Sequence, residues 1–179
     1  MSSPYDVDDD AAPALGTIVD EGRGSLPYEL IHGESLVACA AWALGDARVT
    51  AVDLGTQWAG LVDSGGPFVV HDSLCPMTPA AFISDCVARS VESGAVVVGV
   101  DGSGAVLSPV VLPGAVVAEL TGLPSTDFAE LVRALDAGFA LERRLAPAAA
   151  ARVTSSADVA ALELLTSPET SPETSPEPA

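Results

Sequence analysis

An unbroken apolar run, Ala95–Val100, lies between a Ser-Gly pair and an Asp-Gly pair. Its shortness, its three consecutive valines and the turn residues at both ends favour a strand over a helix. A strand without alternating polar residues is buried on both faces, as in parallel sheets. The chain must therefore supply a layer of helices for each face of the sheet to which this strand belongs.

Segments with the patterns of strands and helices alternate on both sides of this run. Strands are expected at Leu15–Val19, Val49–Leu54, Phe68–His71, Phe139–Leu145 and Arg152–Thr154, and helices at Glu34–Leu44, Thr78–Val91, Pro113–Leu120, Asp127–Ala137 and Asp158–Leu165. Such alternation predicts an α/β protein, here a three-layer α/β/α domain with a mostly parallel, Rossmann-like sheet. Ligands of these sheets bind beyond the carboxyl ends of strands.

The two ends of the chain differ in composition from its middle. Residues 1–13 are acidic, and residues 166–179 contain Thr-Ser-Pro-Glu three times in tandem. A proline at every fourth position excludes a helix, and polar repeats have little to bury. The prediction is one domain over residues 14–165 between two disordered acidic ends.

The charge of the chain excludes several classes of partner. The formal net charge is −18, and all seven basic residues are arginines. Nucleic acids and anionic membranes are bound through clustered basic side chains, so we expect neither as a partner. No apolar run is long enough to span a bilayer, and the N-terminus is acidic where a signal peptide would be basic. We therefore expect a cytoplasmic protein with three free thiols, at Cys39, Cys75 and Cys86.

The loop after the first expected strand is rich in glycine. It contains Gly22, Arg23, Gly24 and Ser25. Glycines let backbone N–H groups approach phosphates, and a cation offsets the phosphate charge. The loop is thus a candidate phosphate site, and a purely structural turn is the alternative interpretation.

Two further polar residues lie near expected strand ends. Asp72 follows the strand Phe68–His71, and its carboxylate is a suitable ligand for Mg²⁺. The alternative is that His71 and Asp72 only terminate the strand. Arg152 precedes the last expected helix, where it is either a phosphate ligand or an ordinary surface arginine.

Two segments resemble the signature motifs of a known family. Val70–Pro79 reads V-H-D-S-L-C-P-M-T-P, and Arg152–Ala160 reads R-V-T-S-S-A-D-V-A. They resemble V-H-D-A-A-R-P-x-T-P and K-I-T-T-P-E-D-L-A of the methylerythritol phosphate cytidylyltransferases of isoprenoid biosynthesis. Weaker matches lie at the glycine loop, at Ser108–Val111 and at Ser125–Asp127. All these segments occur in the same order along the chain as in the family. The resemblance covers roughly residues 14–165.

This resemblance implies a nucleotidyltransferase fold and transfer of a cytidylyl group from CTP to a sugar-alcohol phosphate, with Mg²⁺ as the cofactor. It implies catalytic roles for Arg23 and Arg152, nucleotide contacts from Gly22, Gly24, Ser25, Asp72 and Thr154, and a metal ligand at Asp72.

The departures from the family motifs bear on activity. The motif arginine is Cys75 here, a loop lysine is Tyr28, and the motif lysine is Arg152, which keeps the charge. A short turn, Asp101–Gly104, replaces the family's Thr-Asp-Thr loop and the long arm through which it dimerises. We therefore expect weak or lost transfer activity and a monomer or weak dimer.

Three hypotheses follow. The chain is a residual or altered nucleotidyltransferase that binds CTP, a non-catalytic nucleotide-binding or regulatory relative, or an interaction protein that works through its acidic tail. An intact cytidylyltransferase encoded in the same genome would favour the last two.

Overall fold

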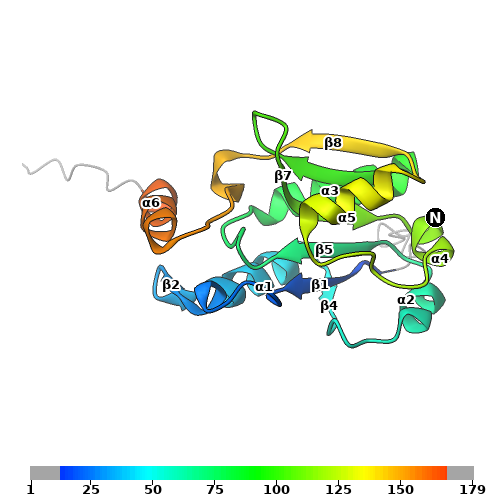
Figure 1. Cartoon of the computed structure of the whole chain (residues 1–179), viewed down its shortest axis with the longest axis horizontal. Coiled ribbons are helices and arrows are strands. Elements are labelled where there is room, and N and C mark those ends of the chain that lie inside the picture. The colour runs from blue at the N-terminus through cyan, green and yellow to red at the C-terminus, as the bar shows by residue number, and fades with distance from the viewer. Residues whose placement is uncertain (1–12, 169–179) are drawn as a thin grey trace, which may run out of the picture.

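A six-stranded sheet forms the centre of the computed structural model, which describes residues 13–168 (Figure 1). Its strands are β1 (Leu15–Val19), β4 (Thr50–Ala51), β5 (Phe68–Asp72), β6 (Val96–Val100), β7 (Val106–Leu112) and β8 (Leu141–Leu145), in the order β4-β1-β5-β7-β6-β8. Only β7 runs antiparallel to its neighbours β5 and β6, and the other pairs are parallel. The predicted, mostly parallel α/β sheet is confirmed.

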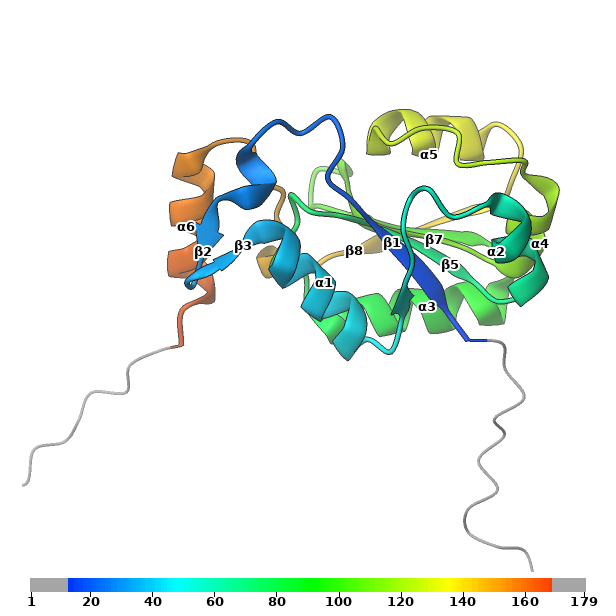
Figure 2. The ribbon, with the colours of Figure 1, turned by 90° about the horizontal axis from the view of Figure 1, so that it is seen from below.

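Helices cover both faces of this sheet (Figure 2). One face carries α2 (Trp58–Ser64), α4 (Gly114–Glu119) and α5 (Phe128–Asp136), and the other carries α1 (Leu36–Asp46) and α3 (Ala80–Ser93). The hairpin β2 (Leu30–Ile31) and β3 (Glu34–Ser35) packs with α6 (Ser156–Thr166) at one end of the sheet, and the short helices are η1 (Leu26–Tyr28) and η2 (Ala148–Ala150). The three layers are those predicted.

The valine run occupies the interior of the sheet as β6. Val96, Val98 and Val100 pack with α5, whereas Val97 packs with α3 on the opposite face. Gly99 lies so close to β7 that a Cβ atom would be 2.6 Å from the carbonyl oxygen of Ser108. Burial on both faces therefore explains why this strand contains no polar residue.

A short turn joins β6 to β7, as the sequence predicts. The Asp101 carboxylate accepts hydrogen bonds from the backbone N–H groups of Ser103 at 2.8 Å and Ala105 at 3.0 Å. The turn leaves no room for an arm at this position. A monomer or weak dimer stays a prediction.

Several element boundaries differ from those predicted. The helix expected from Glu34 begins at Leu36, because Ser35 accepts a hydrogen bond from Ala38 and caps it. The helix expected from Thr78 begins at Ala80 with Pro79 as its N-cap, and the Thr78 hydroxyl donates to the Cys75 carbonyl. The strand expected at Val49–Leu54 is shorter in the structure and contains only Thr50–Ala51. The segment 152–154 is not a strand, and the helix α2 and the strands β2, β3 and β7 were not predicted.

Cys39, Cys75 and Cys86 are free thiols, as expected. No helix among residues 13–168 is both long and apolar enough to span a membrane. Residues 1–12 and 169–179, which hold most of the predicted acidic ends, lie outside the described residues. The domain boundaries stay a prediction.

Candidate functional site

The parallel pairing of β1 with β5 places two predicted site segments side by side. Val19, the last residue of β1, is in register with Asp72, the last residue of β5. The glycine loop that leaves β1 therefore begins next to Asp72. Gly22 and Gly24 both adopt positive φ angles, of 75° and 61°, which favour glycine and turn the loop back over the end of the sheet.

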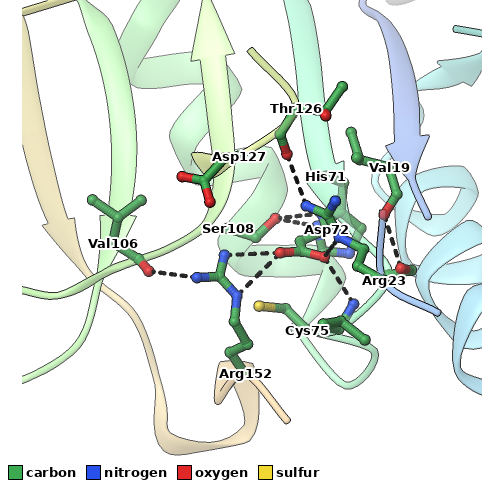
Figure 3. Close-up of polar contacts among 12 residues, drawn as sticks. Val19, Arg23, His71, Asp72, Cys75, Val106, Ser108, Thr126, Asp127 and Arg152 are labelled. Atoms are coloured by element: carbon green, nitrogen blue, oxygen red, sulfur yellow. Dashed lines mark hydrogen bonds and ion pairs between the residues drawn. The ribbon is translucent and has the colours of Figure 1, made fainter. Parts of the chain in front are cut away.

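Arg23 points from this loop to Asp72 (Figure 3). Its Nε donates to Asp72 Oδ1 at 2.9 Å, and its Nη1 and Nη2 donate to the carbonyl oxygens of Glu21 at 2.6 Å and Thr126 at 2.9 Å. Only 12% of the Arg23 side chain is exposed. The guanidinium thus joins the loop, the end of β5 and the segment before α5.

Arg152 reaches the same carboxylate from the other side (Figure 3). Its Nε donates to Asp72 Oδ2 at 3.0 Å, its Nη2 lies 2.8 Å from the same oxygen, and its Nη1 donates to the Val106 carbonyl at 3.2 Å. The next residue fixes this approach, because Val153 is buried with α6 and its N–H donates to the Leu74 carbonyl at 2.8 Å. Three predicted site residues, far apart in sequence, therefore meet.

Asp72 is the centre of this cluster. It is only 1% exposed, and its Oδ1 also accepts a hydrogen bond from the Leu74 N–H at 3.0 Å. A carboxylate has about four lone-pair positions, and those of Asp72 face Arg23, Leu74 and Arg152. A buried charge needs such compensation, so the cluster stabilises the junction of its segments.

A resident metal ion fits this arrangement poorly. Divalent cations need several oxygen ligands, but two guanidinium groups already surround both oxygens of Asp72. Residues 13–168 contain no group of three or more His, Cys, Asp or Glu side chains that could hold a metal ion. A metal ligand at Asp72 stays a prediction, which would require the ion pairs to open.

An aromatic ring supports both arginines. Phe128 is buried at the start of α5, and its ring centroid lies 5.8 Å from Cζ of Arg23 and 5.4 Å from Cζ of Arg152. These distances allow cation–π attraction, which stabilises each guanidinium where it is. Phe128 was not among the predicted site residues; it directly follows Asp127, at which this helix was predicted to begin.

Two cavities border the loop that follows β1. A cavity of about 220 Å³ is bordered by Gly22, Arg23, Asp72, Phe128 and Arg152 among others. A larger one, of about 650 Å³, lies at the ends of β1 and β4 and is lined by Thr17, Asp20, Asp53 and Thr56 among others. The smaller cavity has room for a phosphate group, and the larger has the volume of a typical small-molecule site.

The other predicted nucleotide contacts lie outside the cluster. Ser25 is exposed, and its carbonyl accepts from the Tyr28 N–H within η1. Thr154 is exposed, and both its hydroxyl and its N–H donate to Asp158 of α6. Within residues 13–168, neither shares the contacts of Asp72.

Two of the positions that depart from the family motifs, Tyr28 and Cys75, carry no positive charge. The Tyr28 hydroxyl donates to Asp20 at 3.2 Å across the glycine loop. Cys75 is completely buried beside the cluster. Burial above all, and then the carboxylate of Asp72, raise the pKa of its thiol to about 12 against the opposing effects of Arg152 and Arg23. Cys75 is therefore a neutral thiol.

His71 and Ser108 form a buried pair beneath Asp72. Ser108 Oγ accepts from the Asp72 N–H at 3.0 Å and lies 2.5 Å from Nδ1 of His71. Burial lowers the pKa of His71 to about 4, although Asp72 opposes this shift. The imidazole is therefore neutral at pH 7 and, being fully buried, cannot reach a ligand. Its role is structural, and the sequence did not reveal its partner because Ser108 lies on β7.

We expect this histidine to make the domain sensitive to acid. The pKa of His71 is lower in the folded chain than its ordinary value of 6.5, so the unfolded state binds more protons between about pH 4 and pH 6.5. The free energy of unfolding should fall as the pH drops through this range, by up to about 3 kcal/mol from this group. Urea unfolding at several pH values measures the loss. His71→Asn, which keeps a polar atom near Ser108 but does not titrate, should remove this part of the slope, and an unchanged slope would refute the assignment.

Comparison with known proteins supports the fold. No protein-family model matches the sequence, and no curated protein matches it significantly. The structure is similar to 4-diphosphocytidyl-2C-methyl-D-erythritol synthase from Anaerococcus prevotii, with a TM-score of 0.63 and 11% identity over 87% of this chain and 96% of that one. It also matches 2-C-methyl-D-erythritol 4-phosphate cytidylyltransferase from Thermus thermophilus, with a TM-score of 0.56 and 18% identity over 86% and 98%.

A third solved structure has a similar fold. A CMP-2-keto-3-deoxy-manno-octonic acid synthetase complexed with CTP matches with a TM-score of 0.59 and 12% identity, over 86% of this chain and 98% of that one. The predicted nucleotidyltransferase fold is thereby confirmed. Identities this low establish the fold alone.

Proposed function

We propose that this chain binds a cytidine nucleotide at the carboxyl ends of β1 and β5, and that it transfers the cytidylyl group to methylerythritol phosphate very slowly or not at all. The observation that carries the proposal is the convergence of Arg23, on a glycine loop, and Arg152 at the end of β5. Backbone N–H groups of such a loop and two guanidinium groups are the chemistry that recognises phosphates.

The two cavities support a nucleotide that lies across the glycine loop. A nucleoside occupies the larger cavity, where the Asp20 and Asp53 carboxylates can accept hydrogen bonds from sugar hydroxyls or from the exocyclic amino group of cytosine. The phosphates lie towards Gly22 and Arg23, beside the smaller cavity. In this proposal Mg²⁺ arrives with the triphosphate as its counter-ion, because the residues around Asp72 fit a resident ion poorly.

The weak activity follows from the same geometry. All three nitrogens of the Arg23 guanidinium already donate to the chain itself. Arg152 is held by Asp72 and by the Val106 carbonyl. Phosphoryl transfer depends on cations that offset developing charge at the reacting phosphate. Arginines that are held by the fold bind a phosphate only at the expense of these contacts.

Calorimetry with CTP, in the presence and absence of Mg²⁺, tests the proposal. The chain should bind CTP, and Arg152→Ala should weaken binding about tenfold or more, because a hydrogen-bonded charge is lost. Arg89→Ala is the matched control, since Arg89 pairs with Glu142 on the edge strand β8 and not with the cluster. Circular dichroism should first show that both variants are folded. The proposal fails if CTP does not bind, or if Arg152→Ala binds CTP as tightly as the original chain.

A further inference from the structure

The arrangement of Asp72 between two arginines has the form of a bound oxyanion. One oxygen of the carboxylate accepts from Arg23 at 2.9 Å, and the other lies 2.8 Å and 3.0 Å from two nitrogens of Arg152 (Figure 3). Two arginines and a backbone N–H group, here that of Leu74, are the donors that commonly surround a phosphate. The chain fills this position with its own side chain.

We propose that Arg23 and Arg152 form an oxyanion site that Asp72 occupies as an internal anion, so that Asp72 determines whether the site accepts a phosphate group. The inference rests on the proposed function only in assigning the phosphates of a nucleotide to this place. The oxyanion site itself is defined by the residues and can be tested without a nucleotide.

The charge of the site supports this role for Asp72. With Asp72 ionised, the three side chains carry one net positive charge, and Asp127 borders the same cavity. Replacement of the carboxylate by an amide raises the net charge of the three side chains to two. Because the cluster is largely buried, this change is poorly screened by solvent. An added anion then offsets the positive charge of the two arginines, as the Asp72 carboxylate did before.

Unused donor capacity and space are also present. The Nη2 of Arg152 is buried and approaches Asp72 only as an ion pair, without the alignment of a hydrogen bond. The cavity of about 220 Å³ opens beside it. Cys75, a neutral thiol, adds no competing negative charge on this side. A phosphate oxygen can therefore replace the carboxylate without any new cation.

The test compares the original chain with Asp72→Asn, which has nearly the same shape, using inorganic pyrophosphate as the probe at constant ionic strength. Asp72→Asn should bind pyrophosphate about tenfold or more tighter than the original chain, since hydrogen bonds to charged groups are strong and now lack their internal partner. Its melting temperature should rise with pyrophosphate concentration, because a ligand of the folded state stabilises it. The original chain should show little rise.

Two control variants separate an oxyanion site from a general effect of charge. Glu142→Gln also removes one negative charge beside an arginine, Arg89, but the Glu142 carboxylate is ion-paired with a single guanidinium rather than held between two. It should not gain pyrophosphate binding. The double variant Asp72→Asn with Arg152→Ala lacks one half of the site and should lose the gain. If Asp72→Asn does not fold alone, excess pyrophosphate should restore its folded circular dichroism spectrum.

Each remaining outcome contradicts the proposal. Equal affinities of the original chain and Asp72→Asn for pyrophosphate would show that Asp72 does not control anion binding at the site. Equal gains in Glu142→Gln would show only a general charge effect, and an unfolded Asp72→Asn that pyrophosphate does not rescue would show a purely structural role. Failure of the original chain to bind CTP would overturn the proposed function but not this site. CTP binding without a gain in Asp72→Asn would overturn this site alone.

Discussion

Arginine in place of Cys75 is expected to destabilise the domain by roughly 3–5 kcal/mol, and not to restore transfer activity. Position 75 is where the resembled motif has its arginine, so Cys75→Arg is the obvious attempt at repair. In this structure Cys75 is completely buried next to Arg152 and Arg23. The new guanidinium would be a third cation beside one carboxylate, without a partner, and it would also overfill a packed space.

Urea unfolding of the original chain and the variant measures this effect. Cys75→Ser is the matched control, because it makes the side chain more polar and slightly smaller but leaves it neutral, and it should cost much less. A Cys75→Arg variant that is as stable as the serine variant would show that the loop after β5 can open to place an arginine in solvent. Turnover of CTP and methylerythritol phosphate by Cys75→Arg would show that one substitution had disabled the site.

The meeting of Arg23, Asp72 and Arg152 could be predicted from the sequence because it depends on topology. Two parallel strands that lie side by side bring their carboxyl ends together, and the motif order assigned Arg152 to the same end. Apolar runs such as Val96–Val98 specify burial on both faces, so the layers were also predictable. These features depend on the order and pattern of residues rather than on individual contacts.

The ion pairs themselves could not be predicted, because they depend on side-chain contacts across the fold. The sequence suggested Asp72 as a metal ligand, whereas in the structure the arginines surround its carboxylate. Ser108 binds the Asp72 N–H because β7 lies antiparallel to β5, and no strand was predicted at the position of β7. Phe128 supports both arginines through the packing of α5. Each contact joins residues that are distant in sequence.

The helix starts show how local contacts shift boundaries. Threonine is a residue type that is preferred at N-caps, but the Thr78 hydroxyl donates to the Cys75 carbonyl inside the loop after β5. Pro79 then takes the capping position with an extended backbone. Ser35 caps α1 because the preceding residues pair with β2 in a small hairpin.

Cytidylyl transfer from CTP to methylerythritol phosphate should be slower than about 1 per second, the lower part of the ordinary enzyme range, and is expected to be undetectable in a standard assay. Cys75 and Tyr28 supply no cation where the resembled motifs have an arginine and a lysine, and Tyr28 instead bonds to Asp20. Asp20 and Glu21 add negative charge to the loop next to the expected phosphates. Each missing cation should remove about 1 kcal/mol or more of transition-state stabilisation, although losses within one site need not add.

Release of pyrophosphate from CTP, with and without methylerythritol phosphate, measures this rate, with Mg²⁺ and Mn²⁺ supplied in turn and an active cytidylyltransferase as the positive control. The reason to expect so large a loss is that the two arginines that remain are committed to Asp72 and to backbone carbonyls, so neither is free to follow charge as it develops on the reacting phosphate. Binding of CTP with no pyrophosphate release would support the non-catalytic role. Turnover at about 1 per second or faster would mean that the cluster opens in the presence of substrates, and would overturn the proposal of slow or lost transfer.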